Sequence, residues 1–205
     1  GLEIAHEDLA PNITANNSWD VANDDYDPTK DSSEVGGDHG TSVAGLAAAR
    51  GWNNIGTRGS APKATLAGCN YLEYQTTLSE RICLGNDTSK PLHVNDVWNM
   101  SYGSGAGGTG GSENGRFAFD SADYYGVADW VDRTQNLRSG KGGIYVRSNG
   151  NNFSYGSLNC GPGNNGLISC DQGSFESTEA IPYLITVAAL RADGIKTSYS
   201  TTGAG

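Results

Sequence analysis

The stretch His39-Gly-Thr-Ser-Val-Ala-Gly45 is the most informative part of this sequence. A histidine stands directly before small residues and a short apolar run, an order that predicts a helix beginning close to the histidine. Gly40, Ala44 and Gly45 would let that helix pack closely while the imidazole faces a cleft, where a general base works. A lone histidine is more often a structural or surface residue, so the rest of the chain must supply its companions.

Apolar segments of helical and strand-like pattern alternate along the chain. Small apolar residues predict a helix over 43–49, and an amphipathic pattern predicts a longer one over 117–133. The strand-like runs are 64–72, 97–102, 144–148 and 183–190. This order predicts an α/β fold with a mostly parallel sheet and helices on both faces. A turn at Asp193-Gly194 followed by a short strand, Ile195 to Tyr199, predicts one local hairpin.

The composition is that of a folded, acidic domain. The chain has 205 residues, 36% of them hydrophobic, with four Trp and ten Tyr, which is enough for one domain with a sizeable core. Its net charge is −10, which argues against nucleic acid or an anionic membrane as partner and favours cations and basic substrates. No apolar run approaches the roughly 20 residues of a membrane span. A polar opening that begins with Gly1 indicates a mature or truncated piece without a signal peptide.

The four cysteines form two pairs that are close in sequence, Cys69 with Cys83 and Cys160 with Cys170. Gly, Asn and Ser surround them, as in surface loops, so two disulfides and an oxidising, extracytoplasmic compartment are expected. Zinc is the competing use of four cysteines, but no pair is spaced as a Cys-x-x-Cys knuckle.

Two polar segments follow predicted strands, Ser101 to Ser104 and Asn149 to Asn152. In open α/β sheets, binding sites gather beyond the carboxyl ends of the strands, so these segments are candidate site residues. The glycine-rich stretch Gly103 to Gly115 lacks the Lys-Ser/Thr ending of a phosphate loop and is interpreted as a flexible cleft edge.

The segments around His39 and Asn151 resemble those of the subtilisin-like serine proteases, the subtilases. His39-Gly-Thr-Ser-Val-Ala-Gly45 is similar to their catalytic-histidine motif. Gly142-Gly-Ile-Tyr-Val-Arg-Ser-Asn-Gly-Asn151 aligns without a gap on the kexin and furin branch, in which an asparagine amide stabilises the oxyanion. The resemblance implies that His39 is the catalytic base and Asn151 the oxyanion donor. The alternative for Asn151 is a turn asparagine in the left-handed conformation.

Asn99-Met-Ser-Tyr-Gly-Ser104 resembles the subtilase strand that pairs with the extended substrate backbone. The resemblance implies Ser101, Tyr102 and Gly103 as substrate-binding residues, and Asp171 as an acid of the specificity pocket. The position where a second pocket aspartate is expected holds Ala106. Specificity for dibasic sites and a broader specificity therefore both remain open.

Carboxylates cluster in Trp19-Asp-Val-Ala-Asn-Asp-Asp-Tyr-Asp-Pro28, and hard oxygen ligands of this kind suit calcium. The segment resembles the kexin and furin calcium loop, which implies Asp20, Asp25 and Asp27 as ligands. A second family site is implied by an ungapped match through Ala61. Its ligands would be the side chains of Asp8 and Asn53 and the carbonyl groups of Arg50, Ile55 and Thr57. Thr201 stands where the family glutamate of a third calcium site is expected. The alternative for each site is a solvated acidic turn.

The opening, Gly1-Leu-Glu-Ile-Ala-His-Glu-Asp-Leu9, looks like the stretch directly after the catalytic-aspartate motif of the family. The last residues, Tyr199 to Gly205, stop before any Gly-Thr-Ser nucleophile segment. The resemblance covers the whole chain and implies that residues 1–205 are the central part of one peptidase catalytic domain, incomplete at both ends. Without the nucleophilic Ser and the catalytic Asp, this fragment alone is expected to be inactive.

The sequence therefore predicts a fragment of a secreted, calcium-stabilised, kexin-like serine endopeptidase that acts on protein or peptide substrates. A pro-segment or a downstream domain is expected in the parent protein. One rival is an inactive subtilase homologue that serves as a binding module. Another is a calcium-stabilised adhesion or carbohydrate-binding module, which would require all-β patterning rather than the helix predicted between Phe117 and Arg133.

Overall fold

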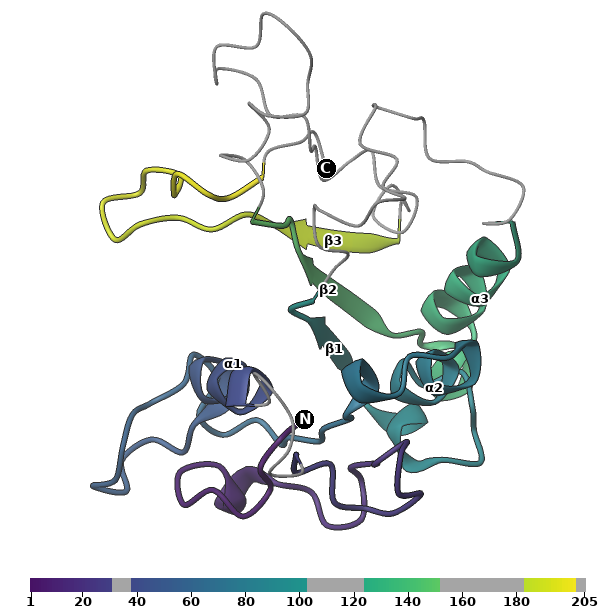
Figure 1. The fold of residues 1–205 in the computed structure, drawn as a ribbon, viewed down its shortest axis with the longest axis horizontal. Coiled ribbons are helices and arrows are strands. Elements are labelled where there is room, and N and C mark those ends of the chain that lie inside the picture. Colours follow the sequence, from purple (N-terminus) through teal and green to yellow (C-terminus); the bar gives the residue numbers. More distant parts are fainter. Residues whose placement is uncertain (31–37, 103–123, 152–182, 202–205) are drawn as a thin grey trace, which may run out of the picture. The chain divides into compact units, whose positions relative to one another are not determined.

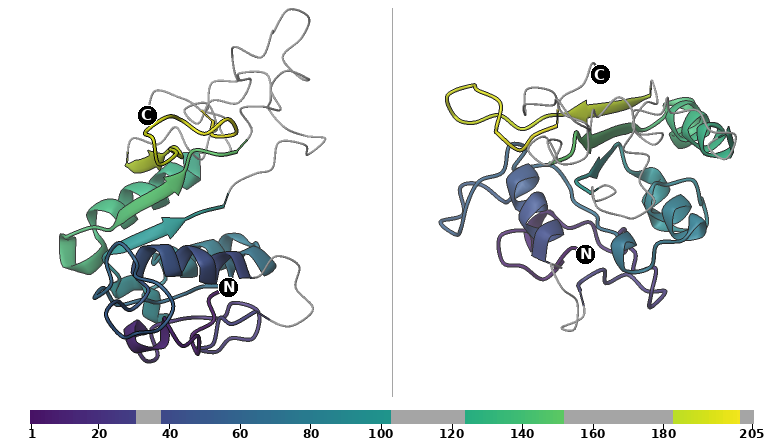
Figure 2. Two further views of the ribbon diagram at one scale, coloured as in Figure 1. Left: turned by 90° about the vertical axis from the view of Figure 1, so that its left-hand side faces the viewer. Right: turned by 45° about the horizontal axis from the view of Figure 1, so that its top comes forward.

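The computed structural model describes residues 1–30, 38–102, 124–151 and 183–201, which form two compact units, Gly1–Asn95 and Asp96–Gly205 (Figures 1 and 2). The first unit contains two α-helices, α1 (Asp38–Ala48) and α2 (Thr77–Cys83). Its described residues also form three short 3-10 helices, η1 (Ala10–Asn12), η2 (Tyr71–Glu73) and η3 (Pro91–Val94). The helix predicted over 43–49 is confirmed, but it begins before the histidine, at Asp38.

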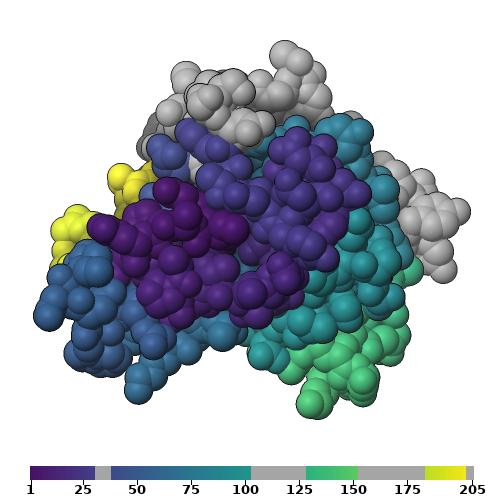
Figure 3. All heavy atoms as spheres, turned by 90° about the horizontal axis from the view of Figure 1, so that it is seen from below, coloured from purple at the N-terminus to yellow at the C-terminus, as the bar shows by residue number. Residues whose placement is uncertain are grey.

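The N-terminal segment packs against α1. Leu2, Leu9 and Ala49 form a buried cluster, and the partly buried Ala44 of α1 packs against it. The backbone N–H of Glu3 donates a hydrogen bond to Thr41 Oγ1 (3.0 Å). In the space-filling view the N-terminal residues, in purple, form a continuous face of this unit (Figure 3). Apolar burial by the small residues of α1 therefore fastens the start of the chain to the helix that carries His39.

The strand predicted over 64–72 does not form. Leu66 and Cys69 make isolated parallel bridges to Ile13 and Trp19, and η2 begins two residues later, at Tyr71. Each bridge joins this segment to the chain between Ile13 and Trp19 at a single point, so no continuous ladder develops. The apolar residues of the segment instead pack into the clusters around Leu9 and Trp19.

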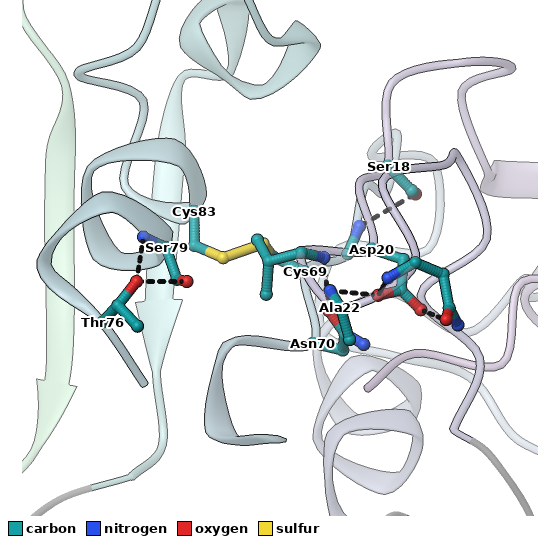
Figure 4. Close-up of a disulfide and its surroundings, with 11 residues drawn as sticks. Ser18, Asp20, Ala22, Cys69, Asn70, Thr76, Ser79 and Cys83 are labelled. Atoms are coloured by element: carbon teal, nitrogen blue, oxygen red, sulfur yellow. Dashed lines mark hydrogen bonds between the residues drawn. A yellow bond between two sulfur atoms is a disulfide. The ribbon is translucent and has the colours of Figure 1, made fainter. Parts of the chain in front are cut away.

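A disulfide joins Cys69 to Cys83 at the end of α2, with 5.6 Å between the two Cα atoms, which confirms this predicted pair (Figure 4). Thr76 caps α2, since its hydroxyl group accepts a hydrogen bond from the backbone N–H of Ser79 (3.1 Å). Buried Ile82 of the same helix packs with Trp19 and Leu92. The predicted partners Cys160 and Cys170 lie outside the described residues.

The second unit contains a parallel sheet in the order β1-β2-β3. Its strands are β1 (Val97–Met100), β2 (Ile144–Ser148) and β3 (Leu184–Val187). The predicted strand over 144–148 is confirmed at both ends, and those over 97–102 and 183–190 are confirmed with shorter bounds. The predicted helix appears as α3 (Tyr124–Gln135), followed by the short α4 (Leu137–Gly140). Residues 117–123 lie outside the described part of the chain.

Aromatic rings connect α3 to one face of this sheet. Tyr145 of β2 is fully buried, stacks on Trp98 of β1 with 4.7 Å between ring centroids, and meets the edge of Trp130 of α3 at 5.2 Å. The guanidinium group of Arg133 lies 4.2 Å from the Trp130 centroid, a cation–π distance. Burial raises the pKa of the Tyr145 phenol above its ordinary value. The alternation of buried and exposed residues along β1 and β2 thus places their large rings under α3.

The predicted hairpin near Gly194 is a turn with one bridge. Gly194 has φ +78°, and the N–H of Arg191 donates to the carbonyl of Ile195 (2.8 Å). Leu190 and Lys196 form a single antiparallel bridge, but no strand forms over Ile195 to Tyr199. Beyond this bridge, the Lys196 ammonium group donates to the carbonyl of Ser200 (2.9 Å), which is a contact within the segment rather than a further strand pairing.

Candidate active site

His39 is the second residue of α1, and its side chain is exposed. Asp38 precedes it in the first turn and forms an ion pair with Lys30 (3.4 Å). Within the part of the chain that the structure describes, no side chain makes a hydrogen bond to the His39 imidazole. The ring is therefore accessible from solvent and positioned by the start of a helix, as a general base requires.

Gly40 lies against the first residue of the chain. A Cβ atom at Gly40 would overlap the carbonyl oxygen of Gly1, so this glycine is needed for a close backbone approach. The N–H of Leu2 donates to the carbonyl of Pro28 (3.0 Å), which helps to hold the same segment in place. Gly1 therefore lies against the residue that directly follows the candidate base, His39.

Asn151 follows β2 in a loop that is tied to the end of the second unit. The Asn149 side chain is buried and donates to the carbonyl of Thr201 (2.8 Å), and the N–H of Thr201 donates to the carbonyl of Gly150 (3.0 Å). Gly150 takes the left-handed conformation, with φ +86°, whereas Asn151 does not have a positive φ. The Asn151 side chain is exposed. Glycine thus makes the tight turn, and the amide of Asn151 is left accessible.

The predicted substrate strand is described only in part. Ser101 and Tyr102 directly follow β1 and are partly exposed, and Asn99 Nδ2 donates to Ser101 Oγ (2.9 Å). Gly103, Ala106 and Asp171 lie outside the described residues. His39 belongs to the first unit, and Asn151, Ser101 and Tyr102 belong to the second, so each group is described within its own unit.

Asp8 is the centre of a polar cluster in the first unit. Its side chain is only 3% exposed, and its carboxylate accepts hydrogen bonds from the backbone N–H of Thr57 (2.8 Å) and from Asn53 Nδ2 (3.3 Å). The Asp8 carbonyl accepts from the N–H of Arg50 (2.9 Å). The Ile55 N–H donates to Asn53 Oδ1 (3.4 Å). The structure therefore places Asp8 against the loop 50–57, which contains the other four predicted ligands, Arg50, Asn53, Ile55 and Thr57.

The acidic loop after Trp19 is organised by its own backbone. Asp20 is buried, and its carboxylate accepts from the N–H groups of Ala22 (2.7 Å) and Asn23 (2.9 Å). The exposed Asp25 and Asp27 each accept from the N–H two residues later. Among residues 1–30, 38–102, 124–151 and 183–201, no three His, Cys, Asp or Glu side chains are grouped so that they could hold a metal ion. The structure thus does not bring Asp20, Asp25 and Asp27 into one ligand cluster.

Comparison with known proteins decides the family. The Subtilase family matches residues 1–205, the whole of the sequence. The chain belongs to the subtilase family.

Curated relatives of this subtilase chain include secreted and processing proteases. It is 32% identical over 210 residues to the Aeromonas extracellular serine protease of Aeromonas sobria, covering 99% of the chain and 31% of the relative. It is 30% identical over 161 residues to neuroendocrine convertase 2 of Homo sapiens (78% and 24% covered). It is 29% identical over 193 residues to the dibasic-processing endoprotease of Schizosaccharomyces pombe (92% and 25% covered). The chain therefore spans a third or less of the length of these relatives.

Solved structures agree with the subtilase assignment. The crystal structure of the serine protease of Aeromonas sobria superimposes with a TM-score of 0.78 at 30% identity, over 98% of this chain and 32% of that one. The same protease in complex with its chaperone gives a TM-score of 0.69 at 28% identity, over 98% and 32%. The predicted subtilisin-like α/β fold and the resemblance to kexin-like subtilases are confirmed.

Some features of this subtilase were not predicted from its sequence. Asn149 and Thr201, which anchor the loop before Asn151, carry no local pattern that would pair them across about fifty residues. The contact between Gly1 and Gly40 likewise joins distant positions.

In the described part of the chain, no helix is long and apolar enough to cross a membrane.

Proposed function

We propose that the full-length protein is a secreted serine endopeptidase of the subtilase family. The observation that carries the proposal is the exposed imidazole of His39 at the start of α1, in a chain that matches the family along its whole length. The Cys69–Cys83 disulfide supports an oxidising, extracytoplasmic location, as does the name of the extracellular Aeromonas relative. Protein or peptide chains would be the substrates.

His39 would act as general base and then as general acid. It would take the proton of the nucleophilic serine during attack on the peptide carbonyl, and it would return that proton to the leaving amine. The amide of Asn151 would donate a hydrogen bond to the oxyanion of the tetrahedral intermediate. A donor of this kind is worth roughly 100- to 1000-fold in turnover.

The two other catalytic groups would come from outside residues 1–205. An orienting carboxylate supplied just ahead of Gly1 would reach the His39 region, because Gly1 lies directly against Gly40. The nucleophilic serine would follow Gly205. The 205-residue chain alone would then be inactive, since its imidazole has neither a serine to deprotonate nor a carboxylate to orient it.

Calcium would stabilise the protein at the Asp8 cluster. The residues fit this ion, because the buried Asp8 carboxylate and the Asn53 amide provide hard oxygen ligands, and the loop 50–57 that contacts Asp8 is the predicted source of the backbone carbonyl ligands. Asp8 forms no ion pair with a cationic side chain among the described residues, so a bound cation would compensate its charge. The Asn53 amide, whose nitrogen now faces Asp8, would turn to present its oxygen. The loop with Asp20, Asp25 and Asp27 fits a second calcium ion less well, because these three carboxylates are not grouped around one point in the structure.

Cleavage specificity has two candidates. The kexin-like relatives include a dibasic-processing endoprotease, and the net charge of −10 suits basic substrates. Ala106, in place of a pocket acid, favours a broader specificity instead. Paired fluorogenic peptides, identical except for Lys-Arg or Ala-Ala before the scissile bond, would separate the two.

The test of the proteolytic function uses the full-length protein and a fluorophosphonate probe, which labels an activated serine. Wild type should be labelled and should hydrolyse a peptide substrate, whereas His39→Ala should lose several orders of magnitude in turnover and keep its melting temperature. His93→Ala is the matched control, because the ring of His93 makes a local hydrogen bond with the Lys90 carbonyl (2.7 Å), three residues away, and should be dispensable for catalysis. Near-normal hydrolysis by His39→Ala would refute the proposed role.

The alternative function is that of an inactive subtilase homologue used for binding. Such a homologue would keep the subtilase fold and bind peptides without cleaving them, and it would differ from the protease in the residue at the nucleophile position. A folded full-length protein that neither reacts with the fluorophosphonate nor cleaves peptides would favour this alternative.

A further inference from the structure

Trp52 is a large apolar side chain in an unfavourable position. Its side chain is 72% exposed, so it contributes little to the core. Its backbone has φ +63°, in the left-handed region where a bulky residue is strained and Asn or Gly is preferred. The exposed apolar ring and the strained backbone both make Trp52 unfavourable for the stability of the fold, which indicates a role for this residue at the surface.

The loop that carries Trp52 is held in place. It follows α1 and extends away from it (Figure 1, blue). The N–H of Thr57 donates to the buried Asp8 carboxylate (2.8 Å), and the N–H of Gly59 donates to the carbonyl of Ala49 (3.1 Å). These bonds fasten both sides of the loop tip, so the exposed ring is presented on an ordered support. A partner would then lose less conformational entropy on binding.

Two cationic side chains lie near the Trp52 ring. The Arg58 guanidinium carbon lies 5.3 Å from the Trp52 ring centroid, and Lys63 Nζ lies 5.9 Å from it. Gly51 leaves room for the Arg58 stem, because a Cβ there would lie 2.7 Å from Arg58 Cγ. Both cations are exposed, and neither forms an ion pair with a carboxylate of the described residues. We call Trp52, Arg58 and Lys63 the Trp52 patch.

The charge around the patch is opposite to that of the chain. No Asp or Glu occurs from residue 39 to residue 72, although the whole chain has a net charge of −10. Among the described residues, the carboxylate that hydrogen-bonds to the loop, Asp8, is buried. The patch is therefore a positive area on a negative molecule, and it would attract and orient an anionic group.

We propose that the Trp52 patch is a docking site for an acidic segment of a protein partner. Asp or Glu side chains of the partner pair with Arg58 and Lys63, and a neighbouring apolar side chain covers the Trp52 ring. Exposed Trp and Arg together are the residue types that dominate protein–protein hot spots. Two cations at a single ring match a short acidic motif, whereas a long polyanion would need an extended row of cations. An anionic membrane is disfavoured by the net charge.

The test measures fluorescence polarisation of a labelled Glu-Glu-Leu-Glu-Glu-Leu peptide with the full-length protein, pretreated with fluorophosphonate so that hydrolysis does not contribute. The matched Gln-Gln-Leu-Gln-Gln-Leu peptide and a heparin oligosaccharide are the comparison probes. Arg58→Gln and Lys63→Gln should each weaken binding of the acidic peptide by about 3-fold, the size of an exposed ion pair. Trp52→Asn should weaken it about 10-fold and leave the melting temperature unchanged or higher, because Asn tolerates the left-handed backbone.

Lys141→Gln is the charge-matched control, since Lys141 is an exposed cation in the second unit. Binding that is weakened by these factors in the three patch variants and unchanged in Lys141→Gln supports the proposal. Several results would overturn it: no binding of the acidic peptide, equal binding of the Gln peptide, binding that is unchanged in the patch variants, or tight binding of heparin alone.

Discussion

Gly40 and Gly45 lie in the same helix, α1, but in different surroundings. A side chain at Gly40 would overlap the carbonyl oxygen of Gly1, whereas a Cβ atom at Gly45 would meet nothing within 4 Å. The sequence predicts close packing at both glycines. That interpretation is confirmed for Gly40 and wrong for Gly45, because only one side of the helix faces the N-terminal segment.

The two glycines predict opposite effects of the same substitution. Gly40→Ala should destabilise the protein by about 1–3 kcal/mol, because the added methyl group displaces the Gly1 backbone. Gly45→Ala should stabilise it by roughly 0.5–1 kcal/mol, because alanine restricts the unfolded chain and has the higher helix propensity. Urea unfolding of the full-length protein measures both. Equal effects of the two substitutions would contradict the packing of Gly1 against α1.

The disulfide connects two elements and the acidic loop. Cys69 belongs to the segment that bridges to Trp19, and Cys83 ends α2. The neighbouring Asn70 is buried and accepts a hydrogen bond from the N–H of Val21 (2.9 Å) through its side chain. Figure 4 shows these groups side by side, from Asp20 through Asn70 to Cys83. The covalent link thus helps to hold the turn that contains Asp20.

Removal of this disulfide should loosen that turn. The double substitution Cys69→Ala with Cys83→Ala should cost about 2–4 kcal/mol of unfolding free energy, as expected for a closed loop of this length (sequence separation 14). Amide hydrogen exchange should become faster at Trp19 and Val21. The control is Thr77→Ala at the first turn of α2, outside the cap and the disulfide, which should leave exchange at those amides unchanged. Unchanged exchange in the double variant would show that the disulfide does not support the acidic loop.

At the scale of the whole molecule, the buried charge of Asp8 is where we expect stability to respond to a cation. This carboxylate is enclosed by a loop some forty residues away, and hydrogen bonds alone satisfy it among the described groups. If calcium binds there, as we propose, the stability of the full-length protein is linked to the free calcium concentration. A ligand at 100 times its dissociation constant adds about 2.7 kcal/mol.

Chelation should therefore lower the melting temperature of the wild-type protein, and magnesium should restore it poorly because it requires a tighter octahedral shell. Asp8→Asn should melt at a lower temperature and respond much less to chelator. Asp25→Asn with Asp27→Asn tests the second loop in the same way. Differential scanning fluorimetry with and without chelator is the measurement. A wild-type melting temperature that does not change on chelation would contradict calcium binding at both clusters.

Local patterns were sufficient for several elements. The strand predicted over 144–148 is confirmed as β2, because the apolar run Ile144 to Val146 is rich in strand-forming residues and β2 has a parallel partner strand on each side. The helix at His39 follows from its small, helix-compatible residues. The strand prediction for 64–72 was wrong. Apolar content predicts burial, but a strand also needs a neighbouring segment that continues the ladder, and the segment from Ile13 to Trp19 forms only single bridges with it.

The sequence by itself was enough to identify the subtilase family and the candidate residues His39 and Asn151, because short motifs carry residue identity and order. Only the folded chain placed Gly1 against Gly40, brought Asp8 against the loop 50–57, and left Trp52 exposed near two cations. These contacts join positions from a few to about fifty residues apart. Such pairings depend on which backbones approach each other after burial of the core, and no local pattern contains that information.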